Sequence, residues 1–410
     1  MDPEKLRAAK DLFQVSIGNS PSATLRIRQN RYNFPPHESH LKYHLEILRI
    51  PELSKCLSWI PFSRFENVCE LGKGGFAQVY KGTVWWARGT YAIQHQGELR
   101  LSDKAVTLHY ALKEVDESMV AEIVLCSLLS FGDDVNITAT LVGLSLLPTT
   151  NKYLMVMRCG YTNVDNYSLL DRKSTDYFWE NVHGMAKQLA HKLAHMHKLG
   201  ILHYDLHPGN VVIHRSRPCD VLCIIDIGLG AVIEKSQQSQ GAYGRPKYLP
   251  PESFRNKPYT TASDVYCLGT LIWELIIGAP PQGDAGTIRE DGLRDDFAPG
   301  TPEVLRSLIT DCWNPDPSKR PSAEAVWKIL TESVINLPKL APETRAFIEE
   351  RRKSKSKHND DDSNFYIESN LESTLNSSRF YTVEQLSQLS CRSHSEIIGG
   401  IKGGPKEENE

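Results

Sequence analysis

The stretch His203-Tyr204-Asp205-Leu206-His207-Pro208-Gly209-Asn210, together with the later Asp226-Ile227-Gly228, decides how this sequence is interpreted. The first stretch predicts a tight loop that carries Asp205 and Asn210, and Asp226 follows a β-branched run. Three oxygen-bearing side chains are therefore expected to converge on one point. In-line phosphoryl transfer needs such a set. Asp205 would accept the proton of a substrate hydroxyl, and Asn210 and Asp226 would hold Mg²⁺ on the phosphates, because Mg²⁺ prefers oxygen ligands.

A glycine-rich segment, Leu71 to Val79, lies upstream of this loop and predicts a hairpin between two strands. Glycines at a tight turn let backbone N–H groups approach phosphate oxygens closely. Taken alone, such a segment is more often a plain structural turn than a nucleotide site. The residues expected to bind nucleotide here are Leu71, Gly72, Lys73, Gly74, Gly75, Ala77 and Val79.

A lysine at the end of the next strand pattern, Lys113 in Ala111-Leu112-Lys113, could reach the α- and β-phosphates of a nucleotide. The alternative is an ordinary surface lysine. A carboxylate is needed to hold its ammonium group in place, and Glu122, within a helical apolar run, is the best candidate. The interval between Lys113 and Glu122 is short, so the helix is expected to begin soon after the strand.

Several segments together make this sequence similar to the protein kinase superfamily over roughly Phe65 to Leu330. The catalytic-loop and magnesium-loop stretches quoted above carry the resemblance, and three further segments support it: Pro250-Pro251-Glu252, Asp264-Val265-Tyr266-Cys267-Leu268-Gly269 and Cys312-Trp313-Asn314-Pro315-Asp316-Pro317-Ser318-Lys319-Arg320-Pro321. The Trp59-Ile60-Pro61-Phe62 lead-in resembles kinases of the tyrosine-kinase-like group that are expanded in some fungi. The resemblance implies a bilobal α+β fold, with a small β-rich N-terminal lobe and a larger helical C-terminal lobe.

The same resemblance assigns further roles. It implies ATP and Mg²⁺ as cofactors, a protein as substrate, and a buried ion pair between Glu252 and Arg320. Asp264 would hold the backbone of the catalytic loop. The residues that would surround the adenine are Val79 and Ala111 above it, Val212 below it, Met157 as gatekeeper, and Arg158, Cys159 and Gly160 as the hinge.

Some positions depart from the family pattern. Ala77 replaces a glycine and Ile227 a phenylalanine, and we expect activity to survive both changes. Tyr204 replaces the arginine that pairs with activation-loop phosphate, which predicts activity without phosphorylation of Ser236, Ser239 or Tyr243. In two further departures, His207 stands where a γ-phosphate lysine is usual and Arg245 where a hydroxyl residue is usual. These leave the turnover rate and the preferred acceptor open, with serine or threonine favoured over tyrosine.

Composition bounds the remaining questions. The 410 residues contain 47 Lys and Arg against 50 Asp and Glu, which gives a net charge of -3 and no overall field for nucleic acid or a membrane surface. The nine cysteines show no paired metal-site spacing, which favours a cytoplasmic, intracellular protein. We expect a monomer with an N-terminal extension over 1–62, a kinase domain over 63–337 and a disordered tail over 338–410.

Two other functions compete with an active protein kinase. A pseudokinase that only binds nucleotide or partners would explain the departures at His207 and Tyr204. A small-molecule phosphotransferase would also carry a loop like HYDLHPGN, although the segments around Glu252 and Arg320 argue against it. His191, His195 and His197 could suggest a metal, but a structural role is the simpler interpretation.

Overall fold

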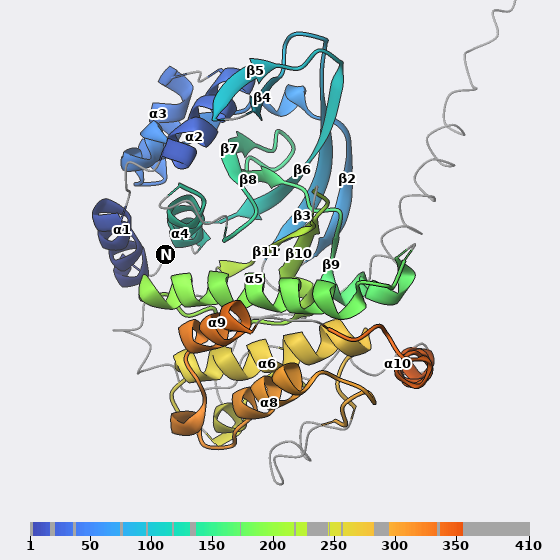
Figure 1. The fold of residues 1–410 in the computed structure, drawn as a ribbon. Helices are drawn as coiled ribbons and strands as arrows, with labels where there is room; N and C mark the ends of the chain where they lie inside the picture. Colours follow the sequence, from blue (N-terminus) through green and yellow to red (C-terminus); the bar gives the residue numbers. More distant parts are fainter. Residues whose placement is uncertain are drawn as a thin grey trace, which may run out of the picture.

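The structure is a computed structural model that describes residues 3–16, 21–35, 38–73, 77–95, 97–116, 119–131, 137–172, 174–216, 219–227, 245, 247–255, 257–282, 295–333 and 337–355. Two lobes lie one above the other, a smaller one around a β-sheet and a larger one of helices (Figure 1). This is the bilobal α+β fold that the sequence predicts. None of the described helices combines the length and the apolar character that crossing a membrane requires.

The N-terminal lobe is built around a sheet whose strands follow the order β1-β7-β8-β6-β3-β2. Neighbouring strands are antiparallel, except that β1 runs parallel to β7. The strands of this lobe are β1 (Ser58–Trp59), β2 (Glu66–Lys73), β3 (Gln78–Trp86), β6 (Val106–Val115), β7 (Leu141–Leu146) and β8 (Tyr153–Arg158), with a separate hairpin of β4 (Ala92–His95) and β5 (Glu98–Leu101).

The central strand β6 explains how this sheet is held. Successive side chains of a strand point to opposite faces. Tyr110 and Leu112 belong to a buried aromatic cluster on one face, together with Phe34, Phe65 and Trp86. Lys113, the next residue along the strand, therefore faces the other way.

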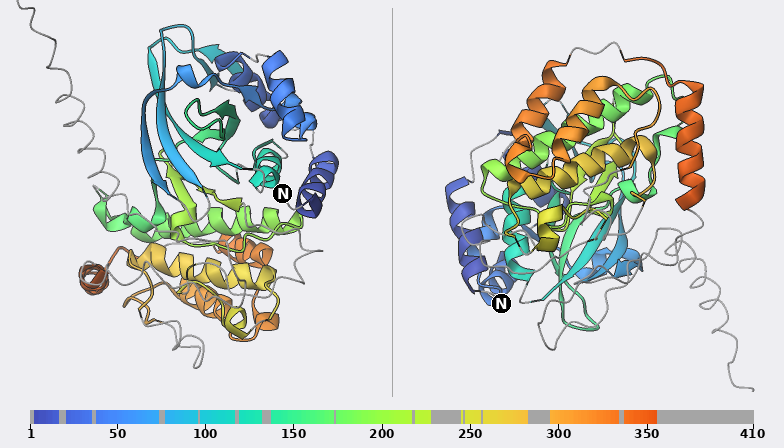
Figure 2. Two further views of the ribbon diagram at one scale, coloured as in Figure 1. Left: turned by 180° about the vertical axis from the view of Figure 1, so that it is seen from behind. Right: turned by 90° about the horizontal axis from the view of Figure 1, so that it is seen from below.

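The C-terminal lobe packs helices around α5 (Phe178–Lys198) and α6 (Thr261–Ile277). A capping box formed by Thr260 and Ser263 begins α6, and Gly278 ends it in the left-handed conformation, with φ of 68°. A small sheet of β9 (Thr162–Asn163), β10 (Val211–His214) and β11 (Val221–Ile224) lies between α5 and the upper lobe (Figure 2). Among the described residues of this lobe, the other helices are η4 (Val164–Asn166), η5 (Leu169–Asp171), η6 (Pro208–Asn210), η9 (Pro251–Arg255), α8 (Glu303–Cys312), η10 (Pro317–Lys319), α9 (Ala323–Glu332) and α10 (Pro342–Lys355).

The N-terminal extension is folded onto the upper lobe. It forms α1 (Pro3–Ser16), α2 (Pro21–Asn33) and α3 (Glu38–Ile47), then η1 (Pro51–Lys55), β1 and η2 (Phe62–Arg64). α1 and α2 lie beside α4 (Val120–Phe131), as both ribbon views show (Figures 1 and 2). Because β1 belongs to the sheet of the N-terminal lobe, the expected boundary at residue 62 does not separate two independent units.

The expectation of disorder from residue 338 onward is wrong for 342–355, which form α10 against the C-terminal lobe. Ile348 and Thr344 of this helix are fully buried, and Arg352 forms a bidentate pair with Asp171 at 2.9 and 3.0 Å. Residues 356–410 lie outside the described part.

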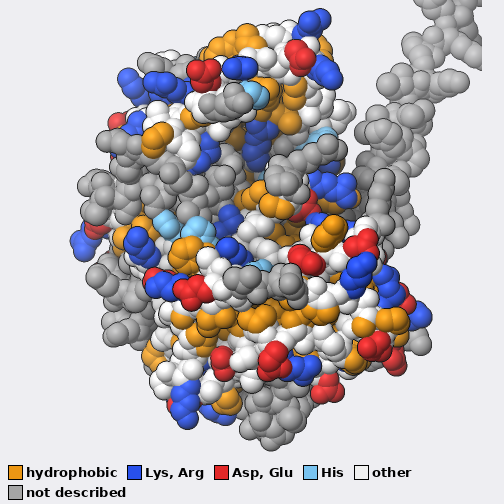
Figure 3. All heavy atoms as spheres, in the orientation of Figure 1, with side chains coloured by type: hydrophobic (Ala, Val, Ile, Leu, Met, Phe, Trp, Pro, Cys, Tyr) orange, Lys and Arg blue, Asp and Glu red, His pale blue; other side chains and the backbone are white. Residues whose placement is uncertain are grey.

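Lysine, arginine and acidic side chains are interspersed over the face drawn in Figure 3.

Candidate active site

Lys113 lies on β6 where β3 and β8 flank it. Its register partners are Val79 on β3 and Met155 on β8. This pairing places Val79, at the end of the glycine-rich segment, directly beside the lysine. The hydrogen-bonded ladder on both sides fixes the backbone from which the ammonium group projects.

Two carboxylates meet the Lys113 ammonium group. Its Nζ atom lies 2.7 Å from Oε1 of Glu122 on α4 and 2.6 Å from Oδ1 of Asp226, which follows β11. The expected pairing of Lys113 with Glu122 is therefore present, although only nine positions separate the two residues. Val120 begins α4 almost immediately after β6 ends, and this is what lets so short a connection form the pair.

Burial and charge compete at this triad. Burial by itself lowers the pKa of Lys113, but Asp226 and Glu122 outweigh it and raise that pKa above its ordinary value. Lys113 is therefore a fixed positive charge at neutral pH. Asp226 keeps a side-chain exposure of 34%, so its carboxylate still reaches the solvent-filled side of the site.

The catalytic-loop residues converge as the sequence predicts. Asn210 donates from Nδ2 to the backbone oxygen of Asp205 at 2.9 Å and toward its Oδ2 atom at 3.4 Å. His207 places Nε2 at 3.6 Å from the same Oδ2 atom, while its Nδ1 atom accepts from the backbone N–H of Gly209 at 3.0 Å. Since Nδ1 is an acceptor, the imidazole presents its N–H to Asp205. Asp205 is thus oriented from two sides.

The pKa of Asp205 follows from these neighbours. Burial raises it, but the charge and the hydrogen bond of His207, then His203 and Arg245, together hold it below its ordinary value. The carboxylate is therefore ionised at neutral pH. An ionised and partly shielded aspartate can accept a proton from a hydroxyl group placed against it.

Asp264, at the start of α6, holds the backbone that precedes Asp205. Its Oδ2 atom accepts from the backbone N–H of His203 at 2.9 Å, and Oδ1 accepts from that of Tyr204 at 3.3 Å. His197 and Tyr259 contact the other sides of the carboxylate at 2.9 and 2.7 Å. These contacts hold Tyr204 at a φ of 70°, a conformation that side-chain-bearing residues adopt at a cost of about 1–3 kcal/mol.

The donor set suits Mg²⁺ bound together with phosphates. Asn210 commits its amide N–H₂ group to Asp205, which leaves its Oδ1 atom as an oxygen ligand. Asp226 uses Oδ1 for Lys113, has a φ of 62° and retains a second carboxylate oxygen. A carboxylate and an amide oxygen are ligands that Mg²⁺ takes alongside phosphate oxygens and water. The residues assigned to the metal therefore fit it.

The residues assigned to the nucleotide base also come together where they are described. Ala111 pairs with Met157 across β6 and β8, and Met157 is buried. A Cβ atom on Gly160 would lie 2.9 Å from Cβ of Val212, so the hinge passes directly against β10. Cys159 donates its backbone N–H to His109 at 3.2 Å. Gly74, Gly75 and Gly228 lie outside the described residues, as does the side chain of Lys73; Leu71 and Gly72 lie on β2, and Ala77 is buried.

One hinge side chain has a structural role. Arg158 reaches the Tyr91 hydroxyl and lies over the rings of Tyr91 and Tyr110, at 5.7 and 5.4 Å from their centroids. Its guanidinium is therefore committed to the aromatic cluster of the N-terminal lobe. Arg158 could therefore contribute to base recognition only through its backbone.

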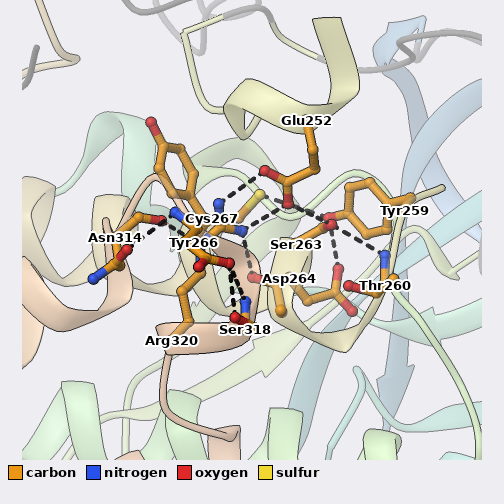
Figure 4. Close-up of polar contacts among 12 residues, drawn as sticks. Glu252, Tyr259, Thr260, Ser263, Asp264, Tyr266, Cys267, Asn314, Ser318 and Arg320 are labelled. Carbon is orange, nitrogen blue, oxygen red and sulfur yellow. Dashed lines mark hydrogen bonds and ion pairs between the residues drawn. The ribbon is translucent and has the colours of Figure 1, made fainter. Parts of the chain in front are cut away.

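An ion pair anchors the C-terminal lobe (Figure 4). Arg320 places Nη1 and Nη2 at 2.7 and 2.8 Å from the two carboxylate oxygens of Glu252. Ser263 donates to the same carboxylate at 2.8 Å, and Arg320 also donates to the backbone oxygens of Ala262 and Asn314. Every charged group of this buried pair is hydrogen-bonded, so the pair ties η9 to α6 and to the segment after α8.

The sequence did not indicate one feature beside Asp205. Arg245 forms an ion pair with Asp165 of η4 at 2.8 Å, and both side chains lie next to the catalytic loop. Asp165 follows the hinge in the sequence, and its acidic side chain was the one feature that could have indicated an ion pair there. Its partner is 80 positions away, and no spacing rule connects the two.

Residues 65–329 match the protein kinase domain family. The chain belongs to this family. The match covers the glycine-rich segment, the catalytic loop and the Glu252–Arg320 anchor of this kinase domain, and it ends within α9. The extension that forms α1 to α3 and the helix α10 lie outside the matched residues.

Several curated relatives are similar to the kinase domain. A probable serine/threonine-protein kinase of Dictyostelium discoideum is 26% identical over 279 residues, which cover 67% of this chain and 28% of that protein. The serine/threonine/tyrosine-protein kinase HT1 of Arabidopsis thaliana is 27% identical over 157 residues, covering 37% of this chain and 40% of HT1. The serine/threonine-protein kinase PkaA of Streptomyces coelicolor is 32% identical over 146 residues, covering 34% of this chain and 27% of PkaA. The chain thus spans well under half the length of these relatives.

Proposed function

We propose that this chain is an ATP-dependent protein kinase that transfers the γ-phosphoryl group to serine or threonine hydroxyl groups of other proteins. The observation that carries the proposal is the contact of Lys113 with Glu122 and Asp226 beside the contact of Asn210 with Asp205. The backbone N–H of Ile225, next to Asp226, donates to the backbone oxygen of Asn210 at 2.8 Å and so joins the two groups. Membership of the protein kinase domain family supports the activity, and the similarity to serine/threonine-protein kinases supports the serine/threonine preference.

The roles of the residues follow from their geometry. Lys113 offers a fixed ammonium group to phosphate oxygens, and Glu122 keeps that group in place. Asp205 orients the substrate hydroxyl and takes its proton, while Asn210 and Asp226 hold Mg²⁺. When bound, Mg²⁺ supplies charge neutralisation at the phosphates. The chain itself thus contributes mainly positioning and electrostatics, as phosphoryl transfer requires.

The wider assignments are part of the same proposal. We place the kinase in the tyrosine-kinase-like group, near the kinases expanded in fungi, on the strength of its WIPF lead-in at Trp59–Phe62. We also propose that it acts in the cytoplasm as a monomer on protein substrates, without nucleic acid or membrane as a partner. The near-neutral net charge of -3 supports the last two points.

Phosphate transfer from labelled ATP to generic protein substrates in the presence of Mg²⁺ tests the proposal. Lys113→Met and Asp205→Asn should each reduce incorporation by about 10²-fold or more. Lys104→Met and Asp103→Asn, exposed positions on the loop between β5 and β6, are the matched controls and should retain parental activity. Equal incorporation by the parent and both site variants would refute the assignment, and mass spectrometry of the product identifies the acceptor hydroxyl.

A pseudokinase is the second candidate, favoured by His207 and Tyr204 in the catalytic loop. Such a protein would be stabilised by ATP and Mg²⁺ in a thermal unfolding experiment, and Lys113→Met would reduce that stabilisation. It would nevertheless transfer no phosphate. This combination of results would replace the kinase assignment with a nucleotide-binding scaffold.

A further inference from the structure

The helix that carries Glu122 is buried on every side. Each residue of α4, from Val120 to Phe131, is buried. A helix that is apolar all round must be covered all round. The N-terminal lobe covers one side of α4 through β7, and α1 and α2 of the extension cover the outside (Figures 1 and 2).

α1 contributes an apolar face to this cover. Leu6, Ala9 and Phe13 recur at the spacing of one helix face, and all three are buried in the same core cluster as Ile123 and the rest of α4. Phe13 has an exposure of 0%. Without these side chains, the outer surface of α4 would face water.

α2 holds the opposite end of α4 through polar contacts. Arg26 donates from Nη2 to the backbone oxygen of Ser130 at 3.0 Å. Ser130 lies in the last turn of α4, where carbonyl groups have no partner within the helix and where a positive charge is favourable. Asn30 donates to the backbone oxygen of Leu141, the first residue of β7, at 3.4 Å. α2 thus links the end of α4 to the sheet.

The chain between the extension and the kinase domain is fixed as well. Ser58 pairs with Gly143 and Trp59 with Leu144, so β1 extends the sheet of the N-terminal lobe. A Cβ atom on Gly143 would lie 2.0 Å from the backbone oxygen of Ser58. Glycine at position 143 is therefore what allows β1 to approach β7.

The carboxylate of Glu122 is buried inside this cover. Glu122 accepts from Lys113 through Oε1, while its buried Oε2 atom has no hydrogen-bond partner among the described residues. Burial raises the pKa of Glu122, and Lys113 and, more weakly, Lys5 of α1 act against that rise.

We propose that α1 and α2 are positioning elements for phosphoryl transfer, which hold α4 where Glu122 meets Lys113. These two helices precede the residues that match the protein kinase family, so the chain would supply its own support for the catalytic ion pair from outside the matched domain. This inference rests on the proposed kinase function and names the part of the chain on which the function depends.

The test uses the full chain with Phe13→Ala. Loss of the Phe13 ring should let α4 move and should lower kcat/KM by about 10- to 100-fold, because small displacements of catalytic groups reduce the rate strongly. It should also raise amide hydrogen exchange in α4 well below the unfolding temperature. Asp11→Ala, an exposed position on the same helix, is the matched control and should change neither quantity.

A double-mutant cycle separates positioning from a general loss of stability. If Phe13 acts through Glu122, Phe13→Ala should cost less than about twofold in a Glu122→Gln background, since the contact it supports is already lost. A merely structural role would give the full loss in both backgrounds and would overturn the proposal.

A parent chain without kinase activity would overturn the proposed function and this inference with it. An active parent whose kcat/KM and α4 exchange are unchanged by Phe13→Ala would overturn this inference alone.

Discussion

Arg245 and Asp165 form an ion pair across Gly209 of the catalytic loop. Nη1 of Arg245 lies 2.8 Å from Oδ2 of Asp165. The point where a Cβ atom on Gly209 would sit is 2.5 Å from Nη2 of Arg245, and 2.9 Å from both Oδ2 of Asp165 and Cε1 of His207. The missing side chain at position 209 is therefore what gives the ion pair its place beside Asp205.

Gly209→Ala should displace both Arg245 and His207. Overpacking of this kind destabilises a fold by about 1–3 kcal/mol. We expect kcat to fall by about tenfold as well, because His207 orients Asp205. Gly184→Ala in α5 is the matched control, since nothing lies within 4 Å of its added Cβ atom. That control should leave kcat unchanged. If Gly209→Ala also keeps the kcat of the parent, the Arg245–Asp165 ion pair is not coupled to catalysis.

Glu252→Gln should destabilise the C-terminal lobe strongly. It leaves the Arg320 guanidinium buried without its carboxylate, and breaking a buried pair in this way costs about 3–5 kcal/mol. Denaturant unfolding measures the loss. Glu324→Gln removes a carboxylate from an exposed pair with Lys328 on α9, and it should have no measurable effect. Equal stabilities of the two variants would contradict the anchoring role of Glu252.

The grouping of the proposed catalytic residues could be predicted from the sequence because each lies in a short segment whose chemistry is local. The spacing of Asp205 and Asn210 on one loop fixes their distance almost independently of the rest of the chain. The pair of Lys113 and Glu122 was within reach for a similar reason, since one strand end and one helix start place both residues.

The packing of α2 of the extension could not be predicted because its buried face is mostly polar. α2 buries Arg26, Asn30 and Asn33, which donate to backbone oxygens of distant segments. Hydrophobic periodicity therefore gives no signal for this helix. α10 is similar, since Arg352 binds Asp171 from a position 181 residues away. Such long-range polar contacts exist only once the fold has brought the partners together.

His207→Asn should move the acidic limb of the pH profile upward. Asparagine keeps an acceptor for the Gly209 N–H but removes the imidazole that faces Asp205 at 3.6 Å. Burial, which raises the pKa of Asp205, would then act with less opposition. In its proposed role Asp205 acts as a base only when ionised, so activity should be lost as the pH falls through its pKa. A raised pKa therefore brings that loss to higher pH.

The measurement is kcat/KM as a function of pH for the parent, His207→Asn and His207→Lys. The lysine variant places an ammonium group beside Asp205, which opposes the effect of burial, so its acidic limb should not move upward. If the limb of His207→Asn coincides with that of the parent, His207 does not control the ionisation of Asp205.

Activity should not depend on phosphorylation of the activation segment. Tyr204 stacks on Tyr259, with ring centroids 4.5 Å apart, and it carries no charge to bind a phosphate. Ser236, Ser239 and Tyr243, the expected phosphate acceptors, lie outside the described residues. The chain with Ser236→Ala, Ser239→Ala and Tyr243→Phe together should retain activity within about twofold of the phosphatase-treated parent.

Tyr204→Phe and Tyr204→Arg distinguish the two uses of this position. The Tyr204 hydroxyl is buried without a hydrogen-bond partner among the described residues, so Tyr204→Phe should keep the stack, the activity and the stability. Tyr204→Arg loses the stack and introduces a guanidinium that can pair with phosphate. Its activity should therefore fall, and any recovery should require phosphorylation. If the activity of the parent disappears on phosphatase treatment, a cationic residue at a position other than that of Tyr204 must bind the phosphate, and the expected independence from phosphorylation is wrong.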